Sequence, residues 1–114
     1  MVTVWWKKTC KTSKKGIDYL DSKGVEYELR DIVSDPPPRE LLEAHVKGDN
    51  LKAFLNTSSK PYRELGVGKN MPDRERLIEL MLEHPDLIKR PVVERDGRVS
   101  FGFDPEAIDR VVAG

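Results

Sequence analysis

The spacing of apolar residues changes along the chain, and the order of these changes restricts the fold more than any other feature. Residues 2–6 are apolar and β-branched or aromatic apart from Thr3, which is typical of a buried strand. Apolar residues then follow helical spacing over residues 12–23, and alternation returns over residues 25–32. A strand, a helix and a second strand in this order favour a parallel pair joined by a right-handed crossover.

The middle of the chain, about residues 35–88, is predicted to be mostly helical. It opens with Asp35 and three consecutive prolines, and proline is tolerated in the first turn of a helix. Short helices are expected at 39–47, at 51–55 and after Pro61. The clearest amphipathic pattern covers 73–83, with Asp73 as its N-cap.

The last third of the chain returns to strand patterns. Residues 91–95 and 98–103 flank Asp96-Gly97, a dipeptide typical of a tight hairpin turn, and a final helix is expected over 105–112. The sequence therefore predicts an α/β protein with a thioredoxin-like fold. A four-stranded mixed sheet would carry a helical insertion between its βαβ and ββα halves, in a single domain over residues 1–114.

Charge and composition exclude several classes of protein. The 114 residues carry twenty basic and twenty acidic side chains, so the chain lacks the basic field that nonspecific nucleic-acid binding requires. No apolar run approaches the ~20 residues that span a bilayer, and the N-terminus does not resemble a secretory signal. His45 and His84 are isolated, so we expect no metal site. We expect a cytoplasmic monomer that binds neither membranes nor nucleic acid directly.

The only cysteine, Cys10, lies where the first strand gives way to a lysine-rich helix. Backbone N–H groups at the start of a helix and nearby cations both stabilise a thiolate. A free cysteine can also be a small buried filler. Five lysines and no acidic residue within positions 7–15 argue against an apolar burial site. We therefore predict a reactive thiol, which also fits a reducing compartment because one cysteine cannot form an internal disulfide.

Cys10 and Ser13 form a Cys-x-x-Ser element, in which the serine cannot resolve a mixed disulfide as a second cysteine would. An external thiol such as glutathione would have to do so. Ser13 is either a hydrogen-bond donor to the thiolate or an ordinary residue of the first helical turn. Thr9, Lys8 and Lys11 are candidate substrate-binding residues, and the lysines either attract anionic thiols or form a solvated face.

Arg90-Pro91 is the second candidate site feature. In a thioredoxin-like core, the proline that opens the third strand is expected to be cis and to face the reactive cysteine. Arg90 would then direct its guanidinium towards Cys10 and bind an oxyanion or a carboxylate. Without that fold, a solvated arginine is the simpler interpretation.

Several short motifs, in this order and spacing, make the chain similar to one known family. They are Cys10-Lys11-Thr12-Ser13, Leu55-Asn56-Thr57-Ser58, Pro61-Tyr62-Arg63-Glu64-Leu65, His84-Pro85, Ile88-Lys89-Arg90-Pro91 and Gly102-Phe103. Over essentially its whole length the chain resembles the ArsC-like family, the arsenate reductase and Spx group of thioredoxin-fold proteins.

The resemblance implies a thiol-dependent oxidoreductase with catalytic Cys10 and Arg90. It implies no bound cofactor, glutathione as co-substrate, and glutathione, glutaredoxin or thioredoxin as partner. Glutaredoxin-linked arsenate reductases of the family place a cysteine and three arginines around the oxyanion. Cys10 and Arg90 match two of these residues, whereas Asn56 and Asp104 stand where the other two arginines would lie. The substrate-binding set implied here comprises Asn56 and Pro91 besides the residues near Cys10.

The resemblance also implies an alternative without catalysis. Spx regulators of the same group bind the RNA polymerase alpha subunit and often carry a Cys-x-x-Cys redox switch. Ser13 removes such an intramolecular switch from this chain but leaves a binding surface open. A nonenzymatic transcriptional regulator is therefore the second hypothesis.

Overall fold

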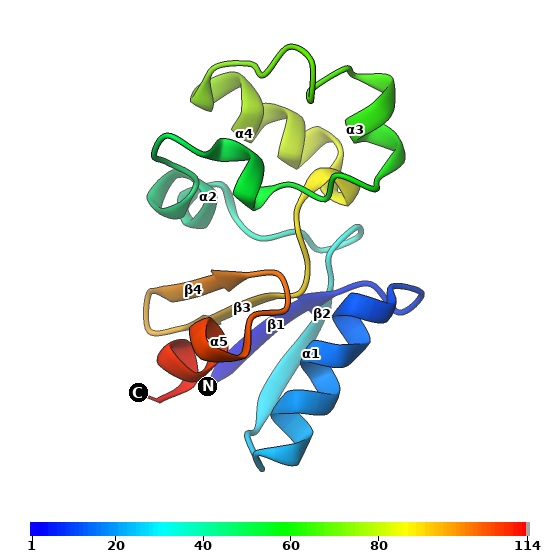
Figure 1. The fold of residues 1–114 in the computed structure, drawn as a ribbon. Helices are drawn as coiled ribbons and strands as arrows, with labels where there is room; N and C mark the ends of the chain where they lie inside the picture. Colours follow the sequence, from blue (N-terminus) through cyan, green and yellow to red (C-terminus); the bar gives the residue numbers. More distant parts are fainter. Residues whose placement is uncertain (114) are drawn as a thin grey trace.

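A four-stranded mixed sheet forms one half of the molecule (Figure 1). The computed structural model describes residues 1–113 and orders the strands β2-β1-β3-β4. Their bounds are β1 Val2–Trp6, β2 Tyr27–Asp31, β3 Val92–Arg95 and β4 Arg98–Phe101. β1 runs parallel to β2 and antiparallel to β3, which forms a hairpin with β4. This is the α/β thioredoxin-like fold that the sequence predicts.

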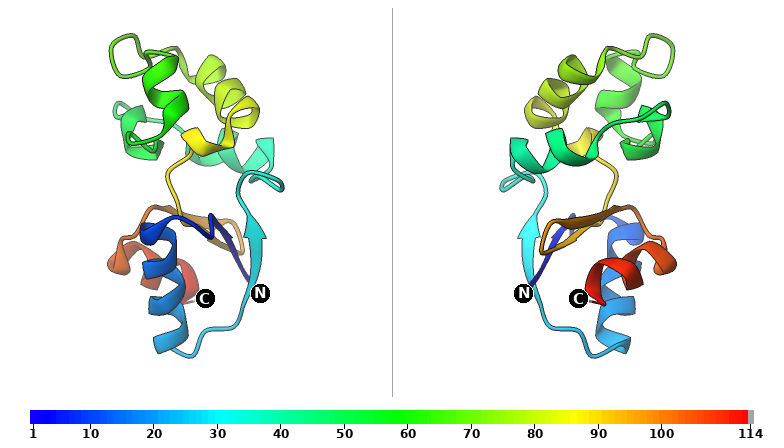
Figure 2. Two further views of the ribbon diagram at one scale, coloured as in Figure 1. Left: turned by 90° about the vertical axis from the view of Figure 1, so that its right-hand side faces the viewer. Right: turned by 90° about the vertical axis from the view of Figure 1, so that its left-hand side faces the viewer.

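Helices α1 (Lys11–Ser22) and α5 (Pro105–Val112) cover one face of the sheet, as both views in Figure 2 show. Val4 of β1 and Val93 of β3, which are paired across the two central strands, lie with Leu20 of α1 and Ile108 of α5 in one buried cluster. The tight turn before β4 places both Asp96 and Gly97 at positive φ, 51° and 84°, as a two-residue hairpin requires. This layer packs α1 and α5 against the two central strands, β1 and β3.

The predicted helical insertion lies at one end of the sheet, at the top of Figure 1. It contains α2 (Arg39–His45), the 3₁₀ turn η1 (Leu51–Phe54), α3 (Lys60–Glu64), α4 (Arg74–Glu83) and the 3₁₀ turn η2 (Pro85–Leu87). Leu42 of α2 and Met81 of α4 are fully buried in a second cluster, which also includes Trp5 and Val92 of the sheet. The insertion and the sheet therefore share a hydrophobic core.

Local capping explains where the insertion helices begin and end. The Asp73 carboxylate accepts a hydrogen bond of 2.9 Å from the Arg76 backbone N–H, so Asp73 is the N-cap of α4 as predicted. Arg74, the first residue of α4, donates through Nε to the Val46 carbonyl at 2.7 Å and through its terminal nitrogen to the Glu43 carbonyl. Carbonyls at the end of α2 are thus bonded by a side chain from α4.

The second strand is shorter than residues 25–32 and its alternation is only partly reflected in burial. Val25 and Tyr27 pack against the cluster beneath α1 and α5, but Leu29 is 40% exposed. β2 is an edge strand, so the helices on that face leave part of it uncovered. Among residues 1–113, no helix has both the length and the apolar character needed to cross a membrane.

Candidate active site

Cys10 occupies the N-cap position of α1, directly after the turn that leaves β1. Its backbone is extended, with φ −94° and ψ 118°. The Cys10 N–H donates to the Lys7 carbonyl at 2.9 Å, and the Cys10 carbonyl accepts from the Lys14 N–H at 3.1 Å. The side chain is half-buried and makes no capping hydrogen bond. The thiol therefore lies at the start of the helix, where unpaired N–H groups favour an anion.

Ser13 lies beside the thiol and is completely buried. Its hydroxyl oxygen accepts a hydrogen bond from the Lys7 backbone N–H at 3.3 Å, which leaves the hydroxyl proton free to be donated. Partial burial raises the pKa of Cys10. The Ser13 backbone N–H, the Arg90 guanidinium and the Ser13 hydroxyl together outweigh that effect, and the pKa lies below its ordinary value. Ser13 thus belongs to the first turn of α1 and is also one of the groups that lower the pKa of Cys10.

The Arg90–Pro91 peptide bond is cis, as predicted. Pro91 is buried against α1, where a Cβ atom added to Gly16 would lie only 2.5 Å from the Pro91 Cγ. Glycine is therefore the one residue that fits this helix position without displacing the proline ring. The close approach of α1 to Pro91 brings the start of α1 near the start of β3.

A small cleft of about 190 Å³ joins the candidate residues. Its lining comes from the start of α1, the loop after η1 and the residues before β3: Cys10, Thr12, Leu55, Asn56, Thr57, Lys89 and Arg90. The predicted residues Cys10, Asn56 and Arg90 are thus brought together. Lys8, Thr9 and Lys11 are exposed and do not belong to this lining, so their substrate role stays a prediction.

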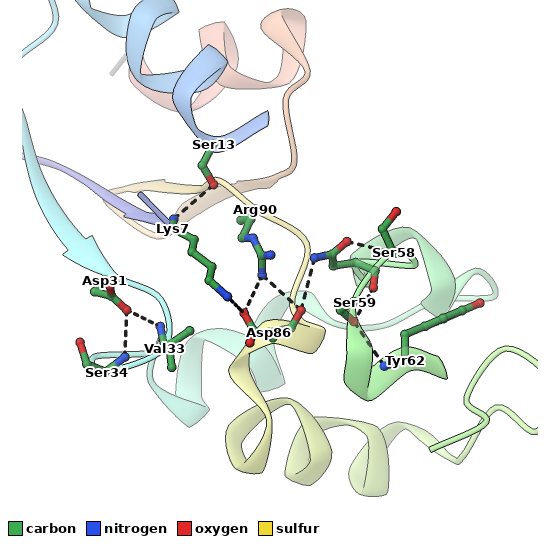
Figure 3. A network of polar contacts seen from close by, with 11 residues as sticks. Lys7, Ser13, Asp31, Val33, Ser34, Ser58, Ser59, Tyr62, Asp86 and Arg90 are labelled. Atoms are coloured by element: carbon green, nitrogen blue, oxygen red, sulfur yellow. Dashed lines mark hydrogen bonds and ion pairs between the residues drawn. The ribbon is translucent and has the colours of Figure 1, made fainter. Parts of the chain in front are cut away.

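Asp86 is a charged residue of the site that the sequence analysis does not identify (Figure 3). Its carboxylate accepts hydrogen bonds from Lys7 Nζ at 2.9 Å and from an Arg90 terminal nitrogen at 3.2 Å. Its backbone carbonyl accepts from the same Arg90 nitrogen at 3.2 Å and from the Asn56 amide at 3.4 Å. An Asp-x-x-x-Arg spacing is present in the sequence, but only the η2 turn brings these groups to Lys7, which lies 79 residues away.

A larger cleft of about 450 Å³ lies between α2 and the sheet. It is lined mainly by apolar and small side chains with Arg30, His45 and two glutamates, and none of the predicted site residues contributes to it. Within the described part of the chain, no group of three or more His, Cys, Asp and Glu residues is placed to bind a metal. The cleft at Cys10 is therefore the candidate active site.

The fold and the site define a thioredoxin-like protein with a single cysteine at the start of its first helix and a cis proline directly after the cleft residue Arg90. Comparison with known families makes this assignment more specific. The ArsC family model matches residues 5–111, and the chain belongs to that family.

Relatives and solved structures agree with this assignment. The chain is similar to the arsenate reductase of Escherichia coli K12, with 32% identity over 94 residues, which is 81% of this chain and 67% of that protein. It is 34% identical over 112 residues to the uncharacterized protein YusI of Bacillus subtilis, covering 95% of both chains. The solved structure of an ArsC family related protein from Bacteroides fragilis superimposes with a TM-score of 0.86 at 32% identity, covering 96% of each chain.

Proposed function

We propose that this protein is a cytoplasmic thiol-dependent oxidoreductase that uses Cys10 as its nucleophile and glutathione as co-substrate. The observation that carries the proposal is the half-buried thiol at the start of α1, with its pKa lowered by Ser13 and Arg90, in an open cleft. A lowered thiol pKa increases the thiolate fraction near neutral pH, and the thiolate is the reactive form. Membership of the ArsC family supports redox chemistry of this kind.

The reaction proceeds by two thiol–disulfide exchanges. The Cys10 thiolate attacks one sulfur of a glutathione mixed disulfide. The substrate's S–S bond breaks, and the substrate leaves as a thiolate while glutathione stays on Cys10. The thiolate of a second glutathione then attacks this adduct, releasing oxidised glutathione and restoring Cys10. The net reaction consumes one free glutathione: the substrate leaves as a thiol, and its former glutathione partner leaves with the second glutathione as oxidised glutathione. No second protein cysteine is needed.

The surrounding residues have separate roles in this proposal. Arg90 binds a carboxylate of the substrate or of glutathione. The backbone at Pro91 aligns the disulfide, and the Ser13 hydroxyl donates to the Cys10 sulfur. Asn56 lines the cleft and offers an amide to the substrate, although its Nδ2 also donates to the Asp86 carbonyl.

Disulfide sulfur is a better match to the cleft than arsenate. The resemblance places Asn56 and Asp104 where glutaredoxin-linked arsenate reductases have arginines. Asp104 is the N-cap of α5, with its carboxylate accepting from the Ala107 N–H at 3.3 Å. Of the three expected arginines only Arg90 remains, which leaves less positive charge for a dianion.

The proposal is tested by incubating the protein with oxidised glutathione and measuring intact mass, followed by a thiol-transfer assay with glutathione. We expect one glutathione adduct, confined to Cys10, and complete loss of transfer in Cys10→Ser. Arg90→Gln should lower transfer roughly tenfold, because a hydrogen bond to a charged group is lost. Arg39→Gln is the matched control, since it removes the same charge from an exposed residue of the insertion.

Unchanged transfer activity in Cys10→Ser would contradict the enzymatic proposal. The regulator hypothesis would then be examined by capture of the RNA polymerase alpha subunit. That capture should be equal for wild type and Cys10→Ser if the protein acts as a binding surface alone.

A further inference from the structure

Asp86 has an arrangement that the proposed reaction does not require. Its carboxylate lies between two cations, Lys7 on the loop before α1 and Arg90 before β3 (Figure 3). The Asp86 and Lys7 side chains are each 34% exposed, whereas that of Arg90 is only 10% exposed. The Arg90 contact is therefore the better shielded of the two, and its charge interaction is less weakened by solvent.

The contacts occupy one terminal nitrogen of the Arg90 guanidinium. That nitrogen donates to both the carbonyl and the carboxylate of Asp86, each at 3.2 Å. The Arg90 Nε is buried and has no hydrogen-bond partner among residues 1–113. Arg90 therefore keeps donor capacity for a ligand but lies directly against a negative charge.

The charges around the cleft show what Asp86 changes. Lys89 and Arg90 line the cleft, whereas Lys7 and Asp86 do not belong to its lining, and Asp86 contacts the cleft residue Arg90. The nearby negative charges are the Asp86 carboxylate, which contacts Arg90, and, during reaction, the Cys10 thiolate. A dianion bound at Arg90 would therefore lie near the Asp86 carboxylate and the Cys10 thiolate, whereas a disulfide brings no charge on its reacting sulfur.

We propose that Asp86 determines the substrate class in this cleft by weakening the binding of dianionic oxyanions at Arg90. The cleft then favours substrates that bring disulfide sulfur and singly charged carboxylates. The proposal rests on the function proposed above for the identity of the favoured substrate. Its core, selection against dianions, rests on the geometry of Asp86, Lys7 and Arg90 alone. Asp86 is a specificity-determining residue that acts through Arg90.

The test measures how well sulfate and, separately, arsenate protect Cys10 from alkylation by the neutral reagent iodoacetamide. The concentration that halves the alkylation rate should fall roughly two- to fivefold in Asp86→Asn, the range expected when one partly exposed charge near the anion is removed. The half-protection concentration should rise in Lys7→Met, because Lys7 no longer neutralises part of the Asp86 charge and Asp86 weakens anion binding at Arg90 more strongly. Asp49→Asn, which removes the same charge from an exposed loop, should match wild type.

The two proposals fail in different ways. Half-protection concentrations equal to wild type in Asp86→Asn and Lys7→Met would overturn the role of Asp86, whatever the thiol-transfer activity. If wild type transfers no thiol but Asp86→Asn gains sulfate protection, the selection against dianions stands and the proposed enzymatic function fails. If Asp86 has only a structural role, Asp86→Asn should lower the thermal stability and leave the half-protection concentration unchanged. If Asp86→Asn does not fold, the half-protection concentration of Lys7→Met decides the question.

Discussion

The side chain of Ser13 interacts with two groups at the start of α1. Its oxygen accepts from the Lys7 N–H at 3.3 Å, and its hydroxyl and backbone N–H both lower the pKa of Cys10. A cysteine at position 13 would be a weaker acceptor for the Lys7 N–H. Serine at this buried position therefore helps to hold the loop that carries the nucleophile.

Ser13→Ala should raise the pKa of Cys10 without restoring that of a free thiol, because the Ser13 backbone N–H remains. The measurement is the pH dependence of the iodoacetamide reaction rate. Its midpoint should lie below the free-cysteine value of about 8.5 in wild type and move upward in Ser13→Ala and in Arg90→Gln. A wild-type midpoint at or above that value would contradict both the thiolate geometry and the catalytic proposal.

The same pKa shift affects stability. Because folding lowers the pKa of Cys10, the thiolate stabilises the folded state at pH values above the unfolded-state pKa. That contribution disappears as the pH falls through the folded-state pKa. Cys10→Ser should therefore lose the corresponding rise in stability between neutral and mildly alkaline pH.

The residues of the site differ in how far the sequence reveals them. Cys10 and Ser13 are recognisable because strand, turn and helix signals are adjacent in the chain, and Arg90-Pro91 follows once the fold is inferred. Asp86 cannot be recognised from the sequence, because its partners Lys7 and Asn56 are 79 and 30 residues away along the chain. The lysines at 8 and 11 are next to Cys10 in sequence but do not line the cleft, so their role in binding substrate stays a prediction.

Helix α1 depends on a close contact with the residue that opens β3. Gly16 is buried in the interior of α1, where glycine costs about 0.5–1 kcal/mol relative to alanine. The Pro91 ring explains its presence, because a Cβ atom would approach Pro91 Cγ to 2.5 Å. Both atoms belong to stiff parts of the structure, so the overlap would have to be relieved by moving the helix away from the strand.

Gly16→Ala should therefore destabilise the protein by about 1–3 kcal/mol despite its better helix propensity, as overpacking in a core does. Urea denaturation followed by circular dichroism measures the change. Lys15→Ala provides the control on the exposed side of the same helix, where we expect a change within about 0.5 kcal/mol. A Gly16→Ala variant as stable as wild type would show that α1 can shift freely over Pro91.

Element boundaries were predictable where a local signal defines them. Asp73 caps α4, and Gly24, at φ +69°, follows the end of α1. The burial of β2 was not predictable in the same way. Leu29 alternates as an inward residue should, but its exposure depends on β2 being an edge strand, which only the strand order determines.

At the scale of the whole molecule, the sheet has a buried cluster on each side. One cluster lies under α1 and α5, and the other joins Trp5 and Val92 to Leu42, Met81 and other insertion residues. The insertion is therefore held to the sheet by hydrophobic packing as well as by the two connecting peptide segments. This arrangement favours a single cooperative unit, and the single domain over residues 1–114 stays a prediction.

Equilibrium unfolding should consequently show one transition. Both tryptophans are in β1, so their fluorescence reports mainly on the sheet, whereas far-ultraviolet circular dichroism reports mainly on the helices. The two midpoints should coincide in urea. Leu42→Ala should lower both together, with a loss of about 2–5 kcal/mol for a fully buried leucine. Separate midpoints, or a shift of the helical signal alone, would indicate an insertion that unfolds independently.

Helix α2 depends on a side chain from α4, a helix much later in the chain. It has only seven residues, well below the ~12–15 at which an isolated helix becomes marginally stable in water. The side chain bonded to the carbonyls of Glu43 and Val46 belongs to Arg74, about thirty positions further along the chain. A peptide excised from this stretch would consequently be a random coil. During synthesis on the ribosome, the segment acquires its partner only after the later helix has emerged.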